Sequence, residues 1–246
     1  MEIESLTFKN EKEYKEFLDY LFSIRDIKYR DFNAKIIVPV DSEIIGIRTP
    51  ILRDIGKKIA KISAENFLNL FEKLFIKKKI KYHEEKVLYG FILGYSKIDF
   101  QERLKRIDFF INIIDNWAVC DIVDSSFKFI NKNKEDFYNY LTSKLSATNL
   151  WEQRFIFVML LAYYIEDKYL KDIFKICEKI KSDEYYVKMA KAWLLSICYV
   201  KFKNETYKFL EKTKLDNWTV NKSIQKIRES LRVTKEEKEK ILLLKR

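Results

Sequence analysis

The scarcity of glycine and proline is the feature that most restricts how this chain can fold. The sequence has 4 Gly and 2 Pro among 246 residues, far below ordinary usage. A β-sandwich, or a fold of alternating strands and helices, needs many more such residues to make its turns. Apolar residues make up 48% of the chain, which is enough to bury a continuous core. The composition therefore favours a globular protein made of helices.

Apolar residues recur at three- and four-residue spacing along nearly the whole sequence, which predicts about a dozen amphipathic helices. Thr49 and Pro50 fit the N-cap and first position of one helix, and Ser63 fits the N-cap of the next. Only residues 34–47 are predicted to be extended or irregular. The predicted helices cover residues 11–25, 50–62, 64–77, 83–96, 100–114, 117–130, 134–146, 150–165, 168–181, 184–202, 205–213, 218–231 and 234–244.

The chain has no segment rich in Pro, Gly or Ser that would separate domains, so we expect residues 1–246 to form one domain. Consecutive helix pairs of about 35–45 residues match the dimensions of HEAT-like repeats. The pairs show no clean sequence repetition, so an ordinary helical bundle is the alternative. The sequence favours an all-α solenoid of HEAT-like pairs, whose concave face would suit a rod-shaped ligand.

Positive charge is in excess, with 48 Lys and Arg against 37 Asp and Glu and a formal net charge of +11. This charge favours a polyanionic partner, either nucleic acid or an acidic membrane surface. The alternative is that a lysine-rich, glycine-poor sequence reflects an AT-rich genome.

The cysteines lack CxxC spacing and lie in apolar helical patterns, so neither a disulfide framework nor a zinc site is expected. The N-terminus carries acidic Glu2 and Glu4, and no apolar run reaches the ~18 residues of a membrane span. We therefore expect a cytoplasmic protein without membrane attachment. The three cysteines are Cys120, Cys177 and Cys198.

His83 is the only histidine, which excludes a Ser-His-Asp set and a His-rich metal centre. It opens a predicted helix beside Glu84 and Glu85, where a solvated surface role is favoured over general-base catalysis. The glycines form neither GxGxxG nor a P-loop. We expect no metal and no cofactor.

The segment Asp115-Asn116-Trp117-Ala118-Val119-Cys120-Asp121 places an aromatic ring beside a carboxylate. Trp117 and Asp121 are four residues apart and would project from the same face of one helix. Taken alone, a Trp packed against an Asp of the same helix is ordinary helix chemistry.

Six segments of the chain occur in the order that they have in one known family. They are GIRTPILRDIGKKIAK (46–61), EEKVLYGFILGY (84–95), IDNWAVCDIVDSSFKFI (114–130), WEQRFIFVMLLAYYI (151–165), DEYYVKMAKAWLLSICYVKF (183–202) and NKSIQKIRESLRV (221–233). In these segments the chain resembles the AlkD-like DNA alkylation repair family. The resemblance implies a curved solenoid of HEAT-like repeats that holds duplex DNA on its concave face.

The resemblance also implies the residues of a lesion site. The family's glycosylases carry a Trp and an Asp spaced WxxxD, which match Trp117 and Asp121. A second Trp of the family matches Trp193, and an Arg that would hold a flanking phosphate matches Arg154.

The implied chemistry suits these residue types. Purines alkylated at N3 or N7 are cationic and leave the sugar readily, so no strong general acid is needed. Asp121 would stabilise the positive charge that grows on the deoxyribose and would position a water. Trp117 and Trp193 would pack against the sugar and backbone. The resemblance thus implies a monofunctional DNA glycosylase of base excision repair, acting as a monomer, that need not draw the base into a deep pocket.

Two basic stretches fit duplex binding. Residues 53–81 contain nine Lys or Arg against three acids, and residues 221–246 contain nine against four. Phosphate contacts give affinity without sequence readout, although a solvated helix surface is the ordinary role of any one lysine. The residues expected to bind DNA are Arg154, Arg48, Arg53, Lys57, Lys222, Lys226, Arg228 and Arg232.

Two other functions remain open. A protein of the same architecture can bind branched or damaged DNA without excising a base, and α-solenoids often serve as scaffolds that bind other proteins. The joint presence of Trp117, Asp121 and Trp193 favours the enzyme.

Overall fold

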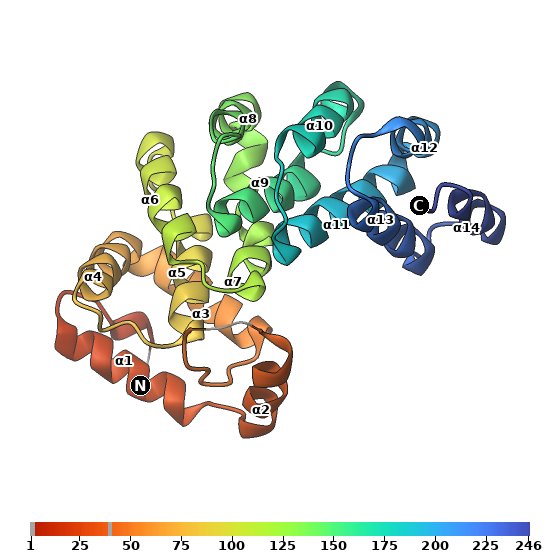
Figure 1. Cartoon of the computed structure of the whole chain (residues 1–246). Coiled ribbons are helices and arrows are strands. Elements are labelled where there is room, and N and C mark those ends of the chain that lie inside the picture. Colours follow the sequence, from red (N-terminus) through yellow and green to blue (C-terminus); the bar gives the residue numbers. More distant parts are fainter. Residues whose placement is uncertain (1–2, 39–40) are drawn as a thin grey trace. The chain divides into compact units, whose positions relative to one another are not determined.

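The computed structural model describes residues 3–38 and 41–246, and within these residues the fold is all-α, as predicted. The only β contact there is an isolated parallel bridge between Glu43 and Tyr82. Three short 3-10 helices are η1 Ile3–Ser5, η2 Asp124–Ser126 and η3 Lys128–Lys132. The α-helices of the described part are α1 Glu11–Ser23, α2 Ile27–Ile36, α3 Thr49–Ile62, α4 Ala64–Ile76, α5 His83–Tyr95, α6 Phe100–Ile113, α7 Trp117–Ile122, α8 Lys134–Ser143, α9 Leu150–Tyr163, α10 Asp167–Lys179, α11 Tyr185–Lys201, α12 Lys203–Lys212, α13 Asn217–Glu229 and α14 Lys235–Leu242 (Figure 1).

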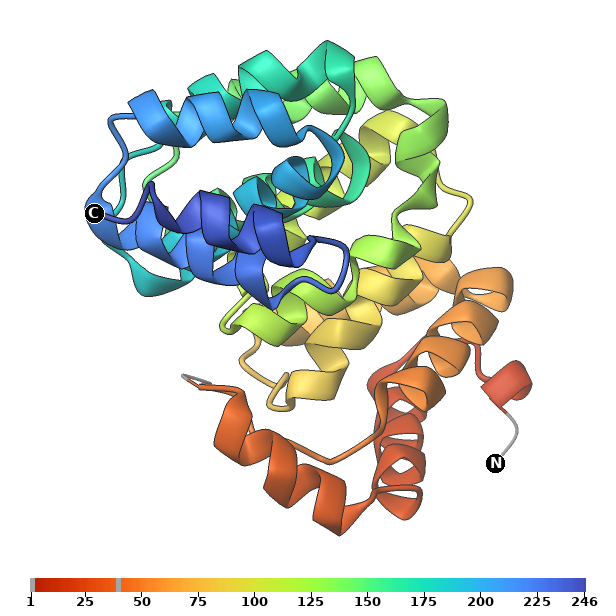
Figure 2. The same ribbon diagram turned by 90° about the vertical axis from the view of Figure 1, so that its right-hand side faces the viewer.

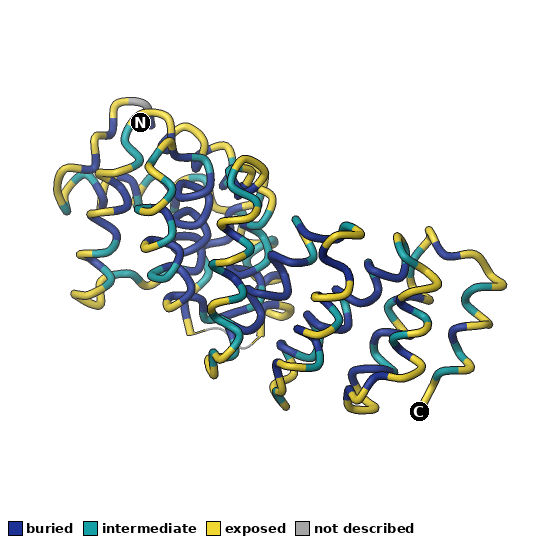
Figure 3. The backbone as a smooth tube through the Cα atoms, turned by 90° about the horizontal axis from the view of Figure 1, so that it is seen from above, coloured by how far each residue is buried: buried dark blue, intermediate teal, exposed yellow. Residues whose placement is uncertain are grey.

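The helices form two compact units, Met1–Lys132 and Asn133–Arg246. In the first unit α5 is the central helix: every one of its residues except Tyr95 is buried (Figure 3). It packs against α3, α4, α6 and α7. Phe75 of α4 meets Phe109 of α6 edge-on, with ring centroids 5.5 Å apart. The first unit is thus built around a helix with no solvated face. The expectation of a single domain over residues 1–246 stays a prediction.

The second unit consists of helix pairs in two rows. Helix α11 packs against α9 and α13 in one row. The other row is joined by aromatic contacts, from Tyr138 of α8 to Tyr169 of α10 at 4.8 Å and from Phe174 of α10 to Phe209 of α12 at 4.3 Å. Both ribbon views place α10 and α12 on the same side of α11 and α13 (Figure 2). Each consecutive pair therefore contributes one helix to each row.

Most predicted helices are confirmed, but α2 was not predicted. Its sequence is polar, so it shows little apolar periodicity, yet the side chain of Asp26 caps it by accepting from the backbone N–H of Tyr29 at 3.0 Å. Residues 34–36 are consequently helical rather than extended. The segment predicted to be extended or irregular also includes residues 39–40, which lie outside the described part.

The predicted helix over residues 117–130 is too long. The α-helical segment ends at Ile122 and is followed by η2 and η3. In this region the hydroxyl of Ser126 donates to the backbone carbonyl of Val123 at 2.6 Å, a local bond of the kind that competes with helix hydrogen bonds. A run of Asp and Ser residues therefore shortens α7.

Two predicted caps also differ in detail. Arg48 occupies the N-cap of α3, so Thr49 and Pro50 are already its first two residues. Ser63 stands at the N-cap of α4 but makes no side-chain cap bond. Its hydroxyl donates instead to the carbonyl of Leu6 at 3.3 Å.

The variant Gly90→Ala is expected to destabilise the protein by about 1–2 kcal/mol. A Cβ at residue 90 would lie 2.6 Å from Cγ1 of Val123 and 3.0 Å from the ring of Phe110, and both side chains are fully buried. Overpacking of this kind costs about 1–3 kcal/mol, while the better helix propensity of Ala returns at most about 1 kcal/mol. Urea denaturation measures the difference; a variant as stable as wild type would contradict the close packing of α5.

Candidate functional site

Trp117 and Asp121 lie on the same helix, α7, and both are half-buried. Their i, i+4 spacing on this helix, which the sequence predicted, is confirmed. The indole N–H of Trp117 donates to the backbone carbonyl of Ile36, at the end of α2, at 3.2 Å. Helix α7 has only six residues, and so short a helix is not stable by itself. Contacts at its two ends must hold it.

Asn116 holds the N-terminal end of α7. Its side-chain oxygen accepts from the backbone N–H groups of Ala118 and Val119 at 3.0 and 3.1 Å, and the residue is fully buried. Its amide nitrogen donates to Asp115 at 2.7 Å. The cap is thereby linked to a buried carboxylate, and an Asn directly before the first helical residue was the sequence signal for it.

Asp115 is itself fixed by two donors. Lys86 of α5 forms an ion pair with it at 2.9 Å, in which the side chains are 10% and 8% exposed, and the hydroxyl of Ser42 donates to it at 2.7 Å. Burial alone would raise the pKa of Asp115, but the hydrogen bonds from Lys86 and Ser42 lower it below its ordinary value. The start of α7 is therefore anchored to α5 by a buried, hydrogen-bonded ion pair.

Arg53 of α3 holds the C-terminal end of α7. Its guanidinium donates to the carbonyl of Ile122 at 3.3 Å, to the hydroxyl of Ser125 at 2.9 Å and to the hydroxyl of Tyr95 at 3.0 Å. It also lies 4.5 Å from the ring centroid of Phe91. A cation at this end suits the helix dipole. In this structure Arg53 supports the helix that carries Trp117 and Asp121, and its binding to DNA stays a prediction.

Asp124, which sequence analysis did not single out, lies close to Asp121. Burial raises the pKa of Asp124, and the negative charge of Asp121 raises it further. The positive charge of Arg53 opposes this effect. Two carboxyl groups and one guanidinium therefore share this end of α7.

His83 is 4% exposed, so the expected surface role is wrong. It is covered because the loop before α3 closes over the start of α5: the backbone N–H of His83 donates to the carbonyl of Glu43 at 2.8 Å. Its ring atom Nδ1 lies 3.2 Å from the side-chain nitrogen of Asn116. The neighbouring Glu84 is buried too and accepts from the backbone N–H groups of residues 45–47.

We expect His83 to make stability depend on pH. Burial lowers the pKa of His83 below its ordinary value of 6.5, so at low pH the unfolded state binds a proton that the folded state does not. This contribution is present above about pH 6.5 and is lost as the pH falls through the folded-state pKa. Because His83 is the only histidine, urea titrations of wild type and His83→Gln at several pH values isolate it. The free energy of unfolding of wild type, relative to that of the variant, should decrease as the pH is lowered. A difference that stays constant with pH would contradict burial of a neutral ring.

The other predicted residues of the first unit, Arg48 and Lys57, are on its surface. Arg48 pairs with Asp26 at 2.8 Å and lies over the ring of Tyr29. Lys57 lies over the ring of Tyr95 at 5.5 Å. Both cations remain accessible to a phosphate, but Arg48 would have to share its charge with Asp26.

In the second unit Trp193 of α11 is half-buried and lines a pocket of about 320 Å³. Two residues predicted to bind DNA, Lys226 and Arg232, line the same pocket. Lys226 pairs with Glu229 at 2.8 Å, while Arg232 is exposed. The structure thus brings the second predicted Trp together with two predicted cations.

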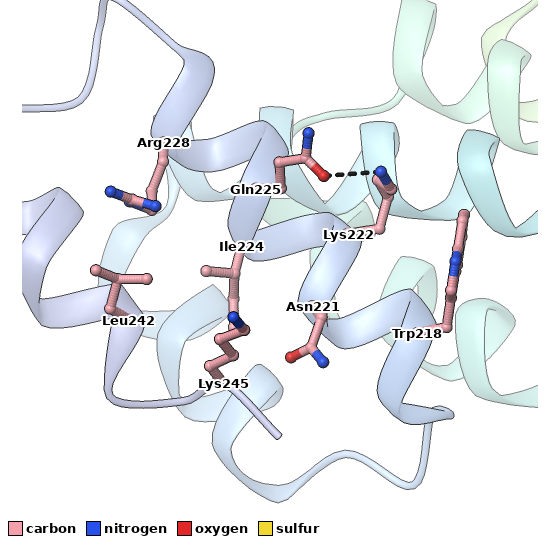
Figure 4. Close-up of a pocket in the computed structure, with 8 residues that line it drawn as sticks. All are labelled: Trp218, Asn221, Lys222, Ile224, Gln225, Arg228, Leu242 and Lys245. Atoms are coloured by element: carbon pink, nitrogen blue, oxygen red, sulfur yellow. Dashed lines mark hydrogen bonds between the residues drawn. The ribbon is translucent and has the colours of Figure 1, made fainter.

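A second basic pocket, of about 370 Å³, lies beside α13 and the end of the chain (Figure 4). Lys222 lies over the ring of Trp218 at 5.5 Å and donates to Gln225 at 2.7 Å. Arg228 and Lys245 add two further positive charges to the lining. Lys222 and Arg228 were predicted from the sequence to bind DNA, whereas Trp218, which is 36% exposed, was not among the predicted residues.

Arg154 of α9 is only 6% exposed. Its guanidinium donates to the backbone carbonyl of Tyr186 at 2.6 Å and lies 5.8 Å from the ring of that residue. It therefore supports the first turn of α11, the helix that carries Trp193. Its predicted contact with a phosphate is untested.

Within residues 3–38 and 41–246, no group of three or more His, Cys, Asp or Glu side chains is arranged to hold a metal ion. No helix in these residues has the length and apolar character that a membrane crossing requires. The three cysteines are buried as thiols.

The family model for DNA alkylation repair enzymes matches residues 13–227 of the chain. The match covers both structural units and confirms the resemblance found in the sequence. No curated protein matches the chain.

Proposed function

Because the chain belongs to the family of DNA alkylation repair enzymes, we propose that it is a DNA glycosylase for purines alkylated at N3 or N7 in duplex DNA. The observation that carries this proposal is the placement of Trp117 and Asp121, half-exposed, on a six-residue helix held at both ends. Precise positioning of a charge is what stabilisation of a transition state requires.

Asp121 acts on the sugar rather than on the base. A purine alkylated at N3 or N7 already carries a positive charge, so its bond to C1′ breaks without prior protonation. As the electron pair of the C1′–N bond moves onto the base, positive charge develops on the deoxyribose. The carboxylate of Asp121 stabilises this charge and accepts a hydrogen bond from the water that attacks C1′.

Each unit supplies an aromatic face, Trp117 in the first and Trp193 in the second, and these electron-rich rings favour cationic groups and pack against the sugar and backbone of the DNA. The location of Trp193 in a pocket with Lys226 and Arg232 supports this role, since those cations suit nearby phosphates. Arg154 steadies the helix of Trp193. Attack of the water at C1′ produces an abasic site. Because no amine attacks C1′, the DNA strand is not cleaved.

The affinity for duplex DNA comes from Lys and Arg side chains that contact phosphates and do not recognise the base sequence. Lys222, Lys226, Arg228 and Arg232 all belong to α13 or the three residues after it. Contacts from these side chains to phosphates hold any duplex equally well, which suits a repair protein that must inspect all sequences.

A comparison of two lesions tests the proposed reaction. Duplexes that contain a single N7-methylguanine or a single hypoxanthine are incubated with excess protein, and the free base is quantified. Release of the cationic base but not of the neutral one is expected, because the site supplies charge stabilisation and no strong acid. Equal release of both bases would contradict the mechanism. Binding of both duplexes without release would favour a DNA-binding protein that excises nothing.

A further inference from the structure

A cavity of about 240 Å³ lies in the first unit between α2, α3, α5 and α7. Most of its lining is apolar, including Phe32, Ile36, Leu52 and Val87. Phe32 and Ile36 are 57% and 45% exposed, so the α2 side of the cavity is open to solvent. Trp117 forms part of the wall. The cavity therefore adjoins the proposed site and shares Trp117 with it.

One buried polar side chain of the lining has no partner. Asn33 is 8% exposed, and within the described residues its amide group makes no hydrogen bond; only its backbone carbonyl accepts one, from Ile37. The polar atoms of this side chain are not among the fully buried unpartnered atoms of the described residues, so they reach the solvent of the open cavity and are available to a ligand. A carboxamide in the wall of an apolar cavity is suited to a ligand that both accepts and donates hydrogen bonds.

His83 offers a second unpaired group, and its tautomer follows from its neighbours. The side-chain oxygen of Asn116 already caps α7, so the atom facing Nδ1 of His83 is the amide nitrogen, which donates. Nδ1 therefore accepts, and a neutral ring must carry its proton on Nε2. No partner for that N–H is found among the described residues, and His83 lines the cavity.

The charges around the cavity are already paired. Glu84 accepts three backbone N–H groups, and the ion pair of Lys86 with Asp115 is buried beside His83. The cavity therefore suits an uncharged ligand. It is smaller than the roughly 300–1,000 Å³ of drug-sized pockets, and its apolar walls with one amide and one imidazole N–H match a flat heterocycle such as a purine, whose edge an Asn side chain reads well.

We propose that this cavity binds the free alkylated purine base that the reaction releases. This inference rests on the proposed function. When the C1′–N bond breaks, its electron pair stays on the base and cancels the positive charge, so the departing base is neutral. Asn33 and His83 then hold its edge, and the wall that includes Trp117 adjoins the site that the base has left.

The test is direct titration of the protein with free 3-methyladenine by calorimetry. The variant Asn33→Leu keeps the size of the side chain but removes its hydrogen bonds, and burying Leu there is compatible with folding. Asn112→Leu, at an exposed residue of α6, is the matched control. We expect wild type and the control to bind alike and Asn33→Leu to bind at least about tenfold more weakly.

The two proposals fail in different ways. Absence of 3-methyladenine binding to wild type would overturn the cavity assignment even if the protein excises alkylated bases. Equal binding by Asn33→Leu would overturn it as well. A third outcome is that wild type binds 3-methyladenine and Asn33→Leu does not, while wild type excises no base. This outcome would support the cavity as a base site and contradict the glycosylase proposal.

Discussion

The variant Asp121→Asn is expected to slow excision of alkylated purines by a factor on the order of 10²–10³, the usual cost of losing one preorganised electrostatic contact. Asparagine keeps the shape of the side chain but not the negative charge that the cationic sugar requires. Asp121 is half-exposed, so the substitution should change the fold and the duplex affinity little. Single-turnover release of 7-methylguanine from duplex DNA measures the rate.

The matched control for this variant is Asp54→Asn. Asp54 is exposed on α3 and pairs with Lys58 at 3.5 Å, so the control removes the same charge from the same unit outside the site. Its rate should stay within about twofold of wild type, since exposed ion pairs contribute little. If Asp121→Asn excises as fast as wild type, the assignment of Asp121 is wrong, although the chain still belongs to its family.

Duplex binding is expected to weaken steeply with salt. A protein that contacts 6–10 phosphates loses about 10³–10⁵ in affinity between 50 and 200 mM salt, and the same slope should hold for duplexes of unrelated sequence. Fluorescence anisotropy over a range of salt concentrations gives the slope of log affinity against log salt. Binding that does not respond to salt would contradict an interface of phosphate contacts.

The location of the interface is tested by two sets of charge removals in the second unit. Replacing Lys222, Lys226, Arg228 and Arg232 by Gln should reduce the salt slope by about 1 for each phosphate that the protein no longer neutralises. The control removes four charges from α10 and the loop after it, in the other row of helices: Lys171, Lys175, Lys179 and Lys181, all exposed. Equal reductions in both variants would mean that total charge, and not the α13 face, determines affinity.

Local signals in the sequence predicted most of the helical fold. The spacing of apolar residues placed α3 to within one residue of its observed start, because Thr49 and Pro50 suit a first helical turn. The same periodicity placed Trp117 and Asp121 on one helix. These features depend on residues close together in the chain.

Features that depend on distant residues could not be predicted in this way. Helix α2 has little apolar periodicity, and the only sequence signal for it is Asp26 at its N-cap. His83 was predicted to be solvated because two glutamates follow it in the sequence, but the loop that carries Glu43 covers it. The contacts that Arg53 makes at the end of α7, with residues 69 to 72 positions later in the sequence, were not predicted either. Charged side chains buried by tertiary contacts are invisible to sequence pattern alone.

The most direct test of the account is a count of products from alkylated DNA. Purified protein is incubated with methylated duplex DNA, and free 3-methyladenine and 7-methylguanine, abasic sites and strand breaks are measured in the same reaction. A monofunctional glycosylase should release both bases, with one abasic site for each base and no excess of breaks. Tight, salt-sensitive binding of the same duplex without release of either base would contradict the proposed function.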